Sequence, residues 1–522
     1  MKPVSRSQAE TFDSSPVTRQ PLVYEFAAYL AEHYGCSRLI ALQRARASKW
    51  FRPGPGIEVF EVDLGLNKRR GKWGRSFGEW ISHGFRQHPL ESADPARASA
   101  PVVVCAGAIE HVPDPGRLLA NIRSLLEHAP VAILTAPERD LCIDQDPPGR
   151  CVDACCSRGW GMAEFRCLLE NAGLEVMFHG LTFTDDISWR KHTILAVVRR
   201  PRDVVAVPPE FRVVALVAAY NEEDVIEPLL RHTIKQGVEV FLLDYWSTDR
   251  TAERAAKFLG RGVTGIAKFP ETGPLPTYDL YQVLKRKEEL AHQIEADWFI
   301  HLDADEIRES PWPGLTIREA LYRVQTEGFN AVNHACLTFH PTGGQYREDS
   351  PLPPQFPYFE FGTRMDHFCQ VRAWKRQPVP VQFAESGGHD VCFPGRRVYP
   401  FRFLLRHYAI RSQEHGEKKV LRERLPRFSP AGRQRGWHIQ YDGISEGRSF
   451  LRDPSTLMQF KPATFYEEYL VERLSGLGKM QAGTVTAAPP RAAQRALGPA
   501  RWWQLFRSAF PRLTPPGTEI VQ

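Results

Sequence analysis

Two aspartates stand two residues apart directly after an apolar run, in the segment WFIHLDADE that begins at Trp298. If residues 298–302 form a buried strand, Asp303 and Asp305 project from its end, where a short turn directs both at one point. Carboxylates at the rim of an apolar core lose hydration, so a cation is needed to compensate them. The pair predicts a site for a hard divalent cation; the alternative is a solvated turn or a salt bridge to nearby Arg308.

Two other apolar runs, residues 213–218 and residues 240–243, also end in polar side chains. Ligands of open parallel sheets bind beyond the carboxyl ends of the strands, where such side chains converge. The three strand ends together indicate a nucleotide-diphosphate site, although the acid after the second run has a structural alternative, which is capping of the following turn. The polar residues at these two ends are Tyr220, Asn221, Glu222 and Asp244.

Strand-like and helix-like patterns alternate in two long stretches, which is typical of α/β domains with a parallel sheet. The fold class that we predict is α/β, with two doubly wound parallel-sheet domains. The predicted strands are residues 102–106, 131–135, 213–218, 238–243 and 298–302, and the predicted helices are residues 115–126, 162–172, 223–236, 251–259 and 281–295. The predicted organisation is a disordered leader at 1–21, a first domain at 22–200, a proline-rich linker at 201–211, a second domain at 212–475 and a flexible tail at 476–522.

Composition narrows the class of protein. The net charge of +6 is small for 522 residues, which argues against a dedicated nucleic-acid binder. The first 20 residues lack the apolar core of a secretory signal, and the longest apolar runs of about nine residues are far shorter than the roughly 20 that span a bilayer. We therefore expect a cytoplasmic protein. Cys151, Cys155 and Cys156 have no partner pair at zinc-ligand spacing, so we expect reduced thiols, with zinc or a disulfide as the alternatives.

Three segments, AAYNEED at 218–224, LDYWSTDRT at 243–251 and LDADE at 302–306, resemble the motifs of family-two glycosyltransferases with the GT-A fold. The resemblance covers residues 212–425 and implies a nucleotide-diphospho-sugar donor. It places Asp303 and Asp305 in a DxD motif that holds Mg²⁺ or Mn²⁺ against the diphosphate. Trp246 departs from the family pattern, which has a small residue there. The residues that would line the nucleotide pocket by this resemblance are Tyr220, Asn221, Glu222 and Asp244.

An inverting glycosyltransferase also needs a general base that deprotonates the acceptor hydroxyl. The Gly-rich segment ESGGHD at 385–390 offers His389 and Asp390, with a purely structural turn as the alternative. The segment LLRHYAIRSQEH at 404–415 resembles one that recurs late in this subgroup of glycosyltransferases. By that resemblance, His407 would complete the metal shell and Arg411 would bind the diphosphate through both arms of its guanidinium. The alternative for His407 is a core histidine.

Residues 101–171 resemble the second half of a class I S-adenosylmethionine-dependent methyltransferase, a Rossmann-type domain. Asp63, after the run IEVFEV, stands where that family has its ribose-binding acid. The family's Gly-rich turn is missing, because residues 39–48 read LIALQRARAS. Glycine allows the tight turn and the close approach of the cofactor. We therefore expect S-adenosylmethionine not to bind and the domain to act as a scaffold or an acceptor-binding module.

Taken together, the sequence predicts a metal-dependent, inverting glycosyltransferase that moves a sugar from a nucleotide-sugar donor to a glycan or glycoconjugate acceptor. A setting in surface-polysaccharide assembly follows from the resemblance alone. One alternative is a methyltransferase whose second domain recognises a glycan, and another is a non-enzymatic binding scaffold. The basic run KKVLRERLPR at 418–427 predicts a solvated helix face, or else contact with an anionic acceptor or a membrane surface. Trp502 and Trp503 suggest a short helix for peripheral membrane contact, with disorder as the alternative.

Overall fold

The structure is a computed structural model of the 522-residue chain. The residues that it describes are 21–43, 56–64, 100–140, 159–182, 193–202, 206–312, 314–344, 346–348, 350–361, 370–429, 432 and 443–461. Of the predicted leader at 1–21, residues 1–20 lie outside these ranges, and Pro21 is the first residue of helix α1. The Cys151 cluster and the tail with Trp502 and Trp503 also lie outside the described ranges, so these predictions stay predictions.

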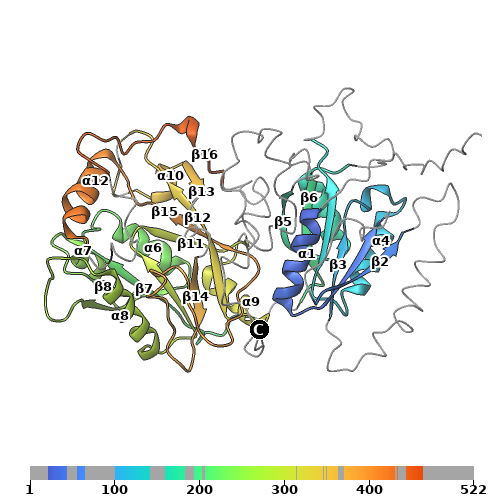
Figure 1. The fold of residues 1–522 in the computed structure, drawn as a ribbon, viewed down its shortest axis with the longest axis horizontal. Helices are drawn as coiled ribbons and strands as arrows, with labels where there is room; N and C mark the ends of the chain where they lie inside the picture. The colour runs from blue at the N-terminus through green and yellow to red at the C-terminus, as the bar shows by residue number, and fades with distance from the viewer. Residues whose placement is uncertain are drawn as a thin grey trace, which may run out of the picture. The chain divides into compact units, whose positions relative to one another are not determined.

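The first sheet has six strands in the order β2-β1-β3-β4-β6-β5 (Figure 1). Its first four strands are parallel, while β6 runs antiparallel to both β4 and β5. The strands are β1 (Arg38–Gln43), β2 (Glu58–Asp63), β3 (Pro101–Cys105), β4 (Ala132–Pro137), β5 (Glu175–Thr182) and β6 (Thr193–Arg199). The helices of this part are α1 (Pro21–Tyr34), the 3₁₀ turn η3 (Ile109–His111), α4 (Pro115–Leu125) and α5 (Met162–Asn171).

Alternate residues of the first sheet face different helices, as the two-residue period of a strand requires. In β1, Leu39 and Ala41 pack in the cluster that contains α1, whereas Ile40 and Leu42 pack with α4 and α5. Helices therefore cover both faces of the sheet. The expectation of an α/β domain in this part of the chain is confirmed.

The second sheet has ten strands, built on the parallel order β10-β7-β8-β9. Its strands are β7 (Val213–Ala219), β8 (Glu239–Asp244), β9 (Val263–Lys268), β10 (Trp298–Asp303), β11 (Glu306–Glu309), β12 (Ala331–Phe339), β13 (Tyr358–Phe361), β14 (Val371–Lys375), β15 (Phe403–His407) and β16 (Met458–Gln459). Its helices are α6 (Ile226–Lys235), α7 (Thr251–Ala256), α8 (Leu280–Gln293), α9 (Ile317–Thr326), α10 (Leu352–Gln355) and α12 (Gln413–Gly416), followed by the π-helix η4 (Glu417–Arg424) and the 3₁₀ turns η5 (Leu425–Arg427) and η7 (Pro454–Thr456).

Helices also cover both faces of the parallel strands of this sheet. In β7, Val213, Ala215 and Val217 share a cluster with α6, while Val214 and Leu216 share another cluster with α8. This doubly wound arrangement confirms the α/β fold class. The three predicted strands at 213–218, 238–243 and 298–302 correspond to β7, β8 and β10.

Mixed strands extend the sheet beyond β10, in the region whose sequence pattern is irregular. β14 pairs antiparallel with β10 and with the start of β12. A register shift at Val332 and Asn333 then lets the rest of β12 pair with β15 and β13. β15 in turn pairs with β11, and Glu306, the residue after Asp305, is in register with His407 at the end of β15. This pairing places Asp305 and His407, two of the predicted metal ligands, side by side.

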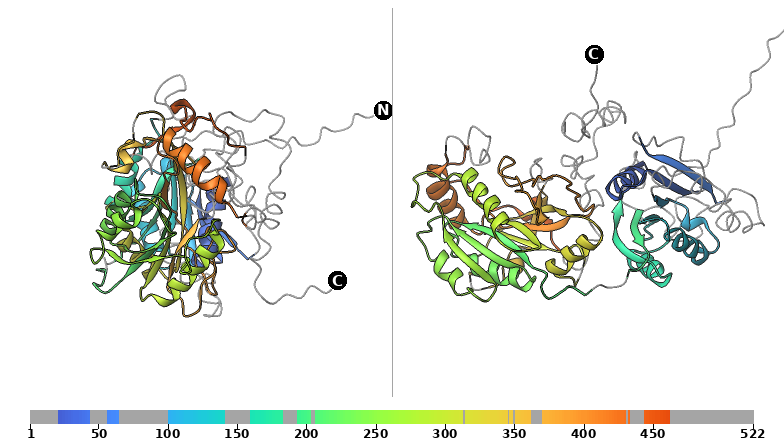
Figure 2. Two further views of the ribbon diagram at one scale, coloured as in Figure 1. Left: turned by 90° about the vertical axis from the view of Figure 1, so that its left-hand side faces the viewer. Right: turned by 90° about the horizontal axis from the view of Figure 1, so that it is seen from below.

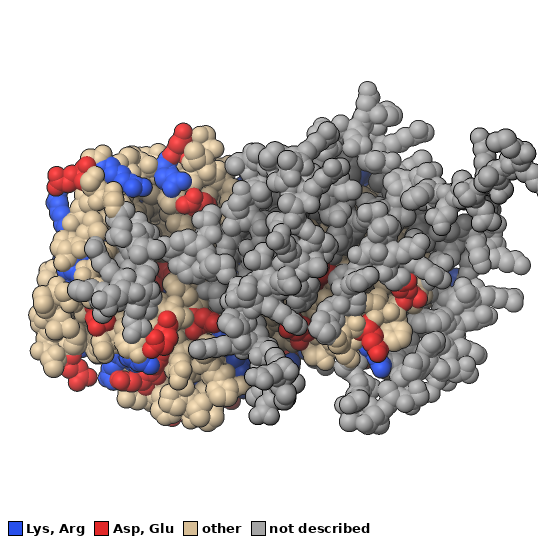
Figure 3. All heavy atoms as spheres, in the orientation of Figure 1, with Lys and Arg blue, Asp and Glu red and all other residues tan. Residues whose placement is uncertain are grey.

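Acidic and basic side chains lie next to one another on the face of the described residues that Figure 3 shows, without a field of one sign. Among the described residues, no helix combines the length and the apolar character that crossing a bilayer requires.

Alanine substitutions at two glycines can test how tightly the segment after β14 packs against His301 of β10. Both Gly388 and Gly395 have positive φ, but a Cβ at Gly388 would lie 2.6 Å from Nε2 of His301, whereas a Cβ at Gly395 meets nothing within 4 Å. Alanine at either site incurs the left-handed backbone cost of about 1–2 kcal/mol. Gly388→Ala should lose roughly 1–3 kcal/mol more because of overpacking. Urea unfolding of both variants measures the difference, and equal losses would contradict the packing.

Candidate functional site

The two aspartates of the DADE segment lie at the carboxyl end of β10. Oδ2 of Asp303 is 3.1 Å from Nη1 of Arg372, and Oδ2 of Asp305 is 2.9 Å from Nζ of Lys419. The Asp303 side chain is 42% exposed and the Asp305 side chain is 6% exposed. One carboxylate thus opens to solvent while the other is buried against a lysine. Arg308, the predicted alternative partner, instead forms an ion pair with Glu306.

Neighbouring basic groups lower the pKa of both aspartates. Burial alone would raise the pKa of Asp303, but His301 and Arg372 hold that pKa below its ordinary value. Burial likewise opposes ionisation of Asp305, yet Lys419 and His407 hold its pKa well below the ordinary value. Burial would lower the pKa of His407, and the Asp305 carboxylate raises it instead.

The donor atoms at this strand end suit a hard divalent cation. Oδ1 of Asp305 lies 3.6 Å from Nε2 of His407, close enough for both atoms to bind one ion, while Lys419 contacts the other oxygen, Oδ2. Carboxylate oxygens with one imidazole are ligands that Mg²⁺ and Mn²⁺ accept. The structure therefore brings Asp305 and His407 within reach of one ion. Among the described residues, Asp303, Asp305 and His407 do not form a group of three close ligand atoms, so metal binding by this set stays a prediction.

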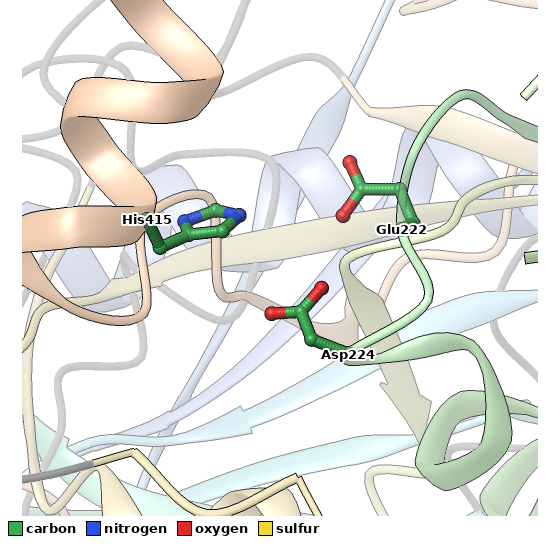
Figure 4. Close-up of side chains that lie close together, drawn as sticks. All are labelled: Glu222, Asp224 and His415. Carbon is green, nitrogen blue, oxygen red and sulfur yellow. The ribbon is translucent and has the colours of Figure 1, made fainter. Parts of the chain in front are cut away.

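A second acidic cluster follows β7. Figure 4 shows Glu222, Asp224 and His415 turned toward one another, and their ligand atoms lie within 4.8 Å of each other. Nη2 of Arg411 lies 2.7 Å from an atom of each of the three. The guanidinium therefore occupies the centre of this cluster, which leaves no room there for a metal ion. Burial would lower the pKa of Arg411, but Asp224 and Glu222 raise it.

Arg411 is 1% exposed, and its donors are committed to protein acceptors. The family resemblance predicted that Arg411 binds the diphosphate. In the structure, its guanidinium binds Glu222 and Asp224 in the loop that follows β7. Nε and Nη2 of Arg411 bind both oxygens of Asp224 at 2.6 and 2.7 Å. This arrangement holds the loop in position.

Lys419 joins the two acidic clusters. Its Nζ lies 2.7 Å from Oε1 of Glu222 and 2.9 Å from Oδ2 of Asp305, and the residue is 5% exposed. The expectation of a solvated helix face holds for its neighbour Lys418, which is exposed, and is wrong for Lys419. A single ammonium thus links the ends of β7 and β10 to the π-helix η4.

The segment from Arg411 to Arg427, which we call the strap, runs along the loop of residues 220–224 in the opposite direction. Figures 1 and 2 show its helices, drawn in orange, beside the green elements of the sheet. Residues four apart lie on one side of a helical segment, and here every fourth strap residue faces the loop or its acidic cluster. The pairs are Arg411 with Asp224 and Glu222, His415 with Arg411, Lys419 with Glu222, Glu423 with Asn221, and Arg427 with Tyr220.

Asn221 connects three segments through its backbone and its amide. Its φ of 53° is left-handed, which asparagine tolerates better than most residues. Its Oδ1 accepts from the backbone N–H of Thr248 at 2.8 Å, and its Nδ2 donates to Glu423 at 3.0 Å. The loops after β7 and β8 and the strap are thereby fixed together.

Asp244 ends β8 and is fully buried. Its Oδ1 accepts from the backbone N–H of Ser247 at 3.1 Å, so it does cap the following turn. Its Oδ2 has no hydrogen-bond partner among the described residues. A buried oxygen without a partner costs about 1–3 kcal/mol, so a donor from a ligand would be accommodated favourably there. Nearby, the ring of Trp246 contacts the ammonium of Lys268 at 4.6 Å.

The two predicted general bases have different surroundings. Nη2 of Arg372 lies 3.0 Å from Nδ1 of His389, and Nη1 of the same guanidinium binds Asp303. Because a guanidinium only donates, Nδ1 is an acceptor and the neutral ring carries its proton on Nε2. The carboxylate of Asp390 forms an ion pair with Arg396. Arg372 thus connects His389, but not Asp390, to the DADE segment.

In the first sheet, Asp63 ends β2 in register with Gln43 at the end of β1. The residues after Gln43 lie outside the described ranges. This is the place where the methyltransferase family has a Gly-rich turn and this sequence has no glycine. The prediction that this part does not bind S-adenosylmethionine therefore stays a prediction.

Sequence reasoning missed several residues of the site: Asp224, Arg372, Lys419 and Arg427. The only signal for the last two was the spacing of charged residues by four along the strap, which a solvated helix shows equally well. Arg372 lies in a strand with no recognisable sequence motif, so nothing in the sequence indicated that it belongs to the site.

No family model matches the chain, and no curated protein matches it in sequence. Among known structures, it is similar to S. aureus TarS residues 1–349 in complex with UDP-GlcNAc, at 17% identity over 26% of this chain and 37% of TarS, with a TM-score of 0.21. The chain thus spans less than half of that structure. It is also similar to the methyltransferase domain of bacterial CtHen1, at 12% identity over 35% of this chain and 100% of that domain, with a TM-score of 0.23. These TM-scores are too low to bear on function.

Lys419 offers a direct test of the site's electrostatics. Lys419→Ala removes the cation between Glu222 and Asp305, so the free energy of unfolding should fall by about 3–5 kcal/mol, as when one partner of a buried ion pair is lost. Lys418→Ala is the matched control, because that side chain is 51% exposed and lies 3.8 Å from Glu423. The control should lose at most about 1 kcal/mol. Similar losses for the two variants in chemical denaturation would contradict the buried bridge.

Lys287 contacts His301 and Leu302 of β10, next to Asp303, and its burial predicts that the stability of the protein depends on pH. It is fully buried, donates to the Leu302 carbonyl at 3.1 Å and lies 3.0 Å from Nδ1 of His301. Burial lowers the pKa of Lys287 to about 8. An unfolded lysine titrates near about 10.4, so between these values the unfolded state binds more protons and the stability of the native state rises with pH.

Lys287→Met removes this gain, so the variant should lose stability relative to the wild type as pH rises from about 8 to about 10. Denaturant unfolding at several pH values measures the difference. Lys285→Met, on the same helix with a side chain that is 37% exposed, should show no such divergence. Parallel stability curves for wild type and Lys287→Met would exclude a depressed lysine pKa.

Proposed function

We propose that residues 212–461 form a glycosyltransferase that moves a sugar from a nucleotide-sugar donor to a glycan or glycoconjugate acceptor. The observation that carries the proposal is that three adjacent parallel strands, β8, β7 and β10, carry acids at their carboxyl ends or within three residues after them. These acids are Asp244, Glu222, and Asp303 with Asp305. Neighbouring strands lie about 4.8 Å apart, so the ends of β8 and β10 are roughly 10 Å apart. That distance is about the reach of a nucleoside from its base to its phosphates.

The base end of the donor is assigned to Asp244. Its unpartnered Oδ2 would accept a hydrogen bond from a ring N–H, which uracil and guanine present and which cytosine and adenine lack. The buried position excludes water, so a base that satisfies this oxygen gains more than it would at the surface. Discrimination between uracil and guanine would then depend on neighbouring side chains such as Trp246.

The diphosphate end is assigned to the DADE segment. Asp303, Asp305 and His407 would hold Mg²⁺ or Mn²⁺, which would neutralise the charge that develops on the departing nucleoside diphosphate. The protein's own contribution is to orient these ligands before the donor arrives. Arg372 fixes Asp303 and Lys419 fixes Asp305, so neither carboxylate has to be ordered during the reaction.

Asp390 remains the proposed general base. His389 is suited to donating rather than accepting, because Arg372 occupies its Nδ1 and the proton therefore sits on Nε2. Asp390, next in the chain, would take the proton of the acceptor hydroxyl and release it after transfer.

Asp305→Asn tests this function most directly. Transfer from a nucleotide sugar should fall at least about 100-fold, equivalent to roughly 2.7 kcal/mol, because the ligand charge next to the leaving group is lost. Chelation should abolish wild-type activity and Mn²⁺ should restore it. Asp453→Asn, which changes an exposed aspartate at the start of η7, is the control and should keep full activity.

Two outcomes would count against the function. One is full activity of a folded Asp305→Asn variant. The other is the absence of thermal stabilisation of the wild type by any member of a panel of sugar nucleotides, since a ligand that binds the native state raises the melting temperature.

A further inference from the structure

Arg427 differs from the other charged residues that the strap presents to the loop after β7. Arg411, Lys419 and Glu423 each bind an oppositely charged or polar side chain of that loop. The Arg427 guanidinium instead lies over the ring of Tyr220, 3.9 Å from its centre, and 5.8 Å from that of Tyr245. Among the residues that the structure describes, none offers Arg427 a carboxylate within 4 Å.

The backbone, rather than an ion pair, holds Arg427 in place. Its carbonyl accepts from the N–H of Tyr278 at 2.6 Å, and the next residue, Phe428, pairs with Tyr278 as a β-bridge. The Tyr278 ring packs edge-on against Tyr245 at 5.0 Å. The backbone of Arg427 is thus held by Tyr278 and its guanidinium by stacking on Tyr220, while no described residue pairs its charge with a carboxylate.

The location of this charge suggests its ligand. Tyr220 follows β7 and Tyr245 follows β8, so Arg427 lies over the ends of these two strands. β7 stands between β8, to whose end the base of a donor is assigned, and β10, to whose end the phosphates are assigned. A guanidinium stacked on an aromatic ring keeps its N–H groups in its own plane, where they can bind an anion. Arginine binds phosphate oxygens in pairs through this planar fork.

We propose that Arg427 binds the diphosphate of the nucleotide-sugar donor. The assignment rests on the proposed function and replaces Arg411 in the role that the sequence suggested for it. The guanidinium N–H groups of Arg411 are bound to Glu222 and Asp224, and the residue is buried, whereas Arg427 is only partly buried. The strap therefore uses its first arginine to fix the loop and its last arginine to bind the ligand.

The test compares a nucleoside diphosphate with the matching nucleoside. Wild-type protein is titrated with UDP, GDP, CDP and ADP, and the tightest binder and its nucleoside are then titrated into Arg427→Met. The variant should bind the diphosphate at least about tenfold more weakly, equivalent to about 1.4 kcal/mol, and the nucleoside within about twofold of wild type. Arg427→Lys, which keeps the charge without the fork, should recover part of the loss.

Arg422→Met is the matched control, because it removes an exposed arginine from the same strap. It should leave both affinities unchanged. Added salt should weaken diphosphate binding more steeply in the wild type than in Arg427→Met, because salt screens the lost charge pair. Thermal unfolding of Arg427→Met and Arg427→Lys separates a loss of binding from a loss of fold.

The outcomes that overturn the proposal are distinct. Equal weakening of nucleoside and diphosphate binding would make Arg427 a base-stacking residue, and unchanged binding of both would remove it from the site. Either result leaves the glycosyltransferase function standing. If the wild type binds none of the four nucleotides, the proposed function itself fails.

Discussion

The ammonium of Lys419, placed between Glu222 and Asp305, is the interaction on which the rest of the site depends. The two carboxylates follow different strands, β7 and β10, and both are almost fully buried. Two buried like charges repel each other, and a cation between them offsets this repulsion. Since that cation comes from the strap, nearly 200 residues away from Glu222 in the chain, the sheet edge is complete only when the strap is docked.

Several further ion pairs surround this lysine. The carboxylates near the strand ends are Glu222, Asp224, Asp303, Asp305 and Glu306, and the cations that pair with them are Arg308, Arg372, Arg411 and Lys419. The buried Lys287 ammonium also acts on Asp303 and Glu306, and Arg424 acts on Asp305. Acids and cations are therefore interleaved at this end of the sheet. On the more open side of Asp305, its carboxylate raises the pKa of His407.

Much of the fold could be predicted because it follows from local pattern. Continuous apolar runs gave β7, β8 and β10, and their abrupt ends placed Asp244, Asp303 and Asp305 at the sheet edge. The strap could not be predicted in this way, because charges spaced by four are typical of a solvated helix and nothing local distinguishes Lys419 from Lys418. The switch of β12 between partners depends on a register shift at Asn333, which leaves no signature in the sequence. Motif resemblance likewise assigned Arg411 to a ligand, since the two acids that bind it become its neighbours only after folding.

The strap is held with very different strength at its two ends. At Arg411 and Lys419 it is attached by buried ion pairs, whose loss costs about 3–5 kcal/mol each. At Arg427 the side chain is held by stacking on Tyr220, worth about 0.5–2 kcal/mol, together with one backbone hydrogen bond to Tyr278. A donor that binds the in-plane N–H groups of Arg427 would leave its stacking on Tyr220 in place, while the bridge at Lys419 keeps Asp305 oriented. The proposed ligand-binding end of the strap is thus separate from the end that fixes the acids proposed to bind the metal.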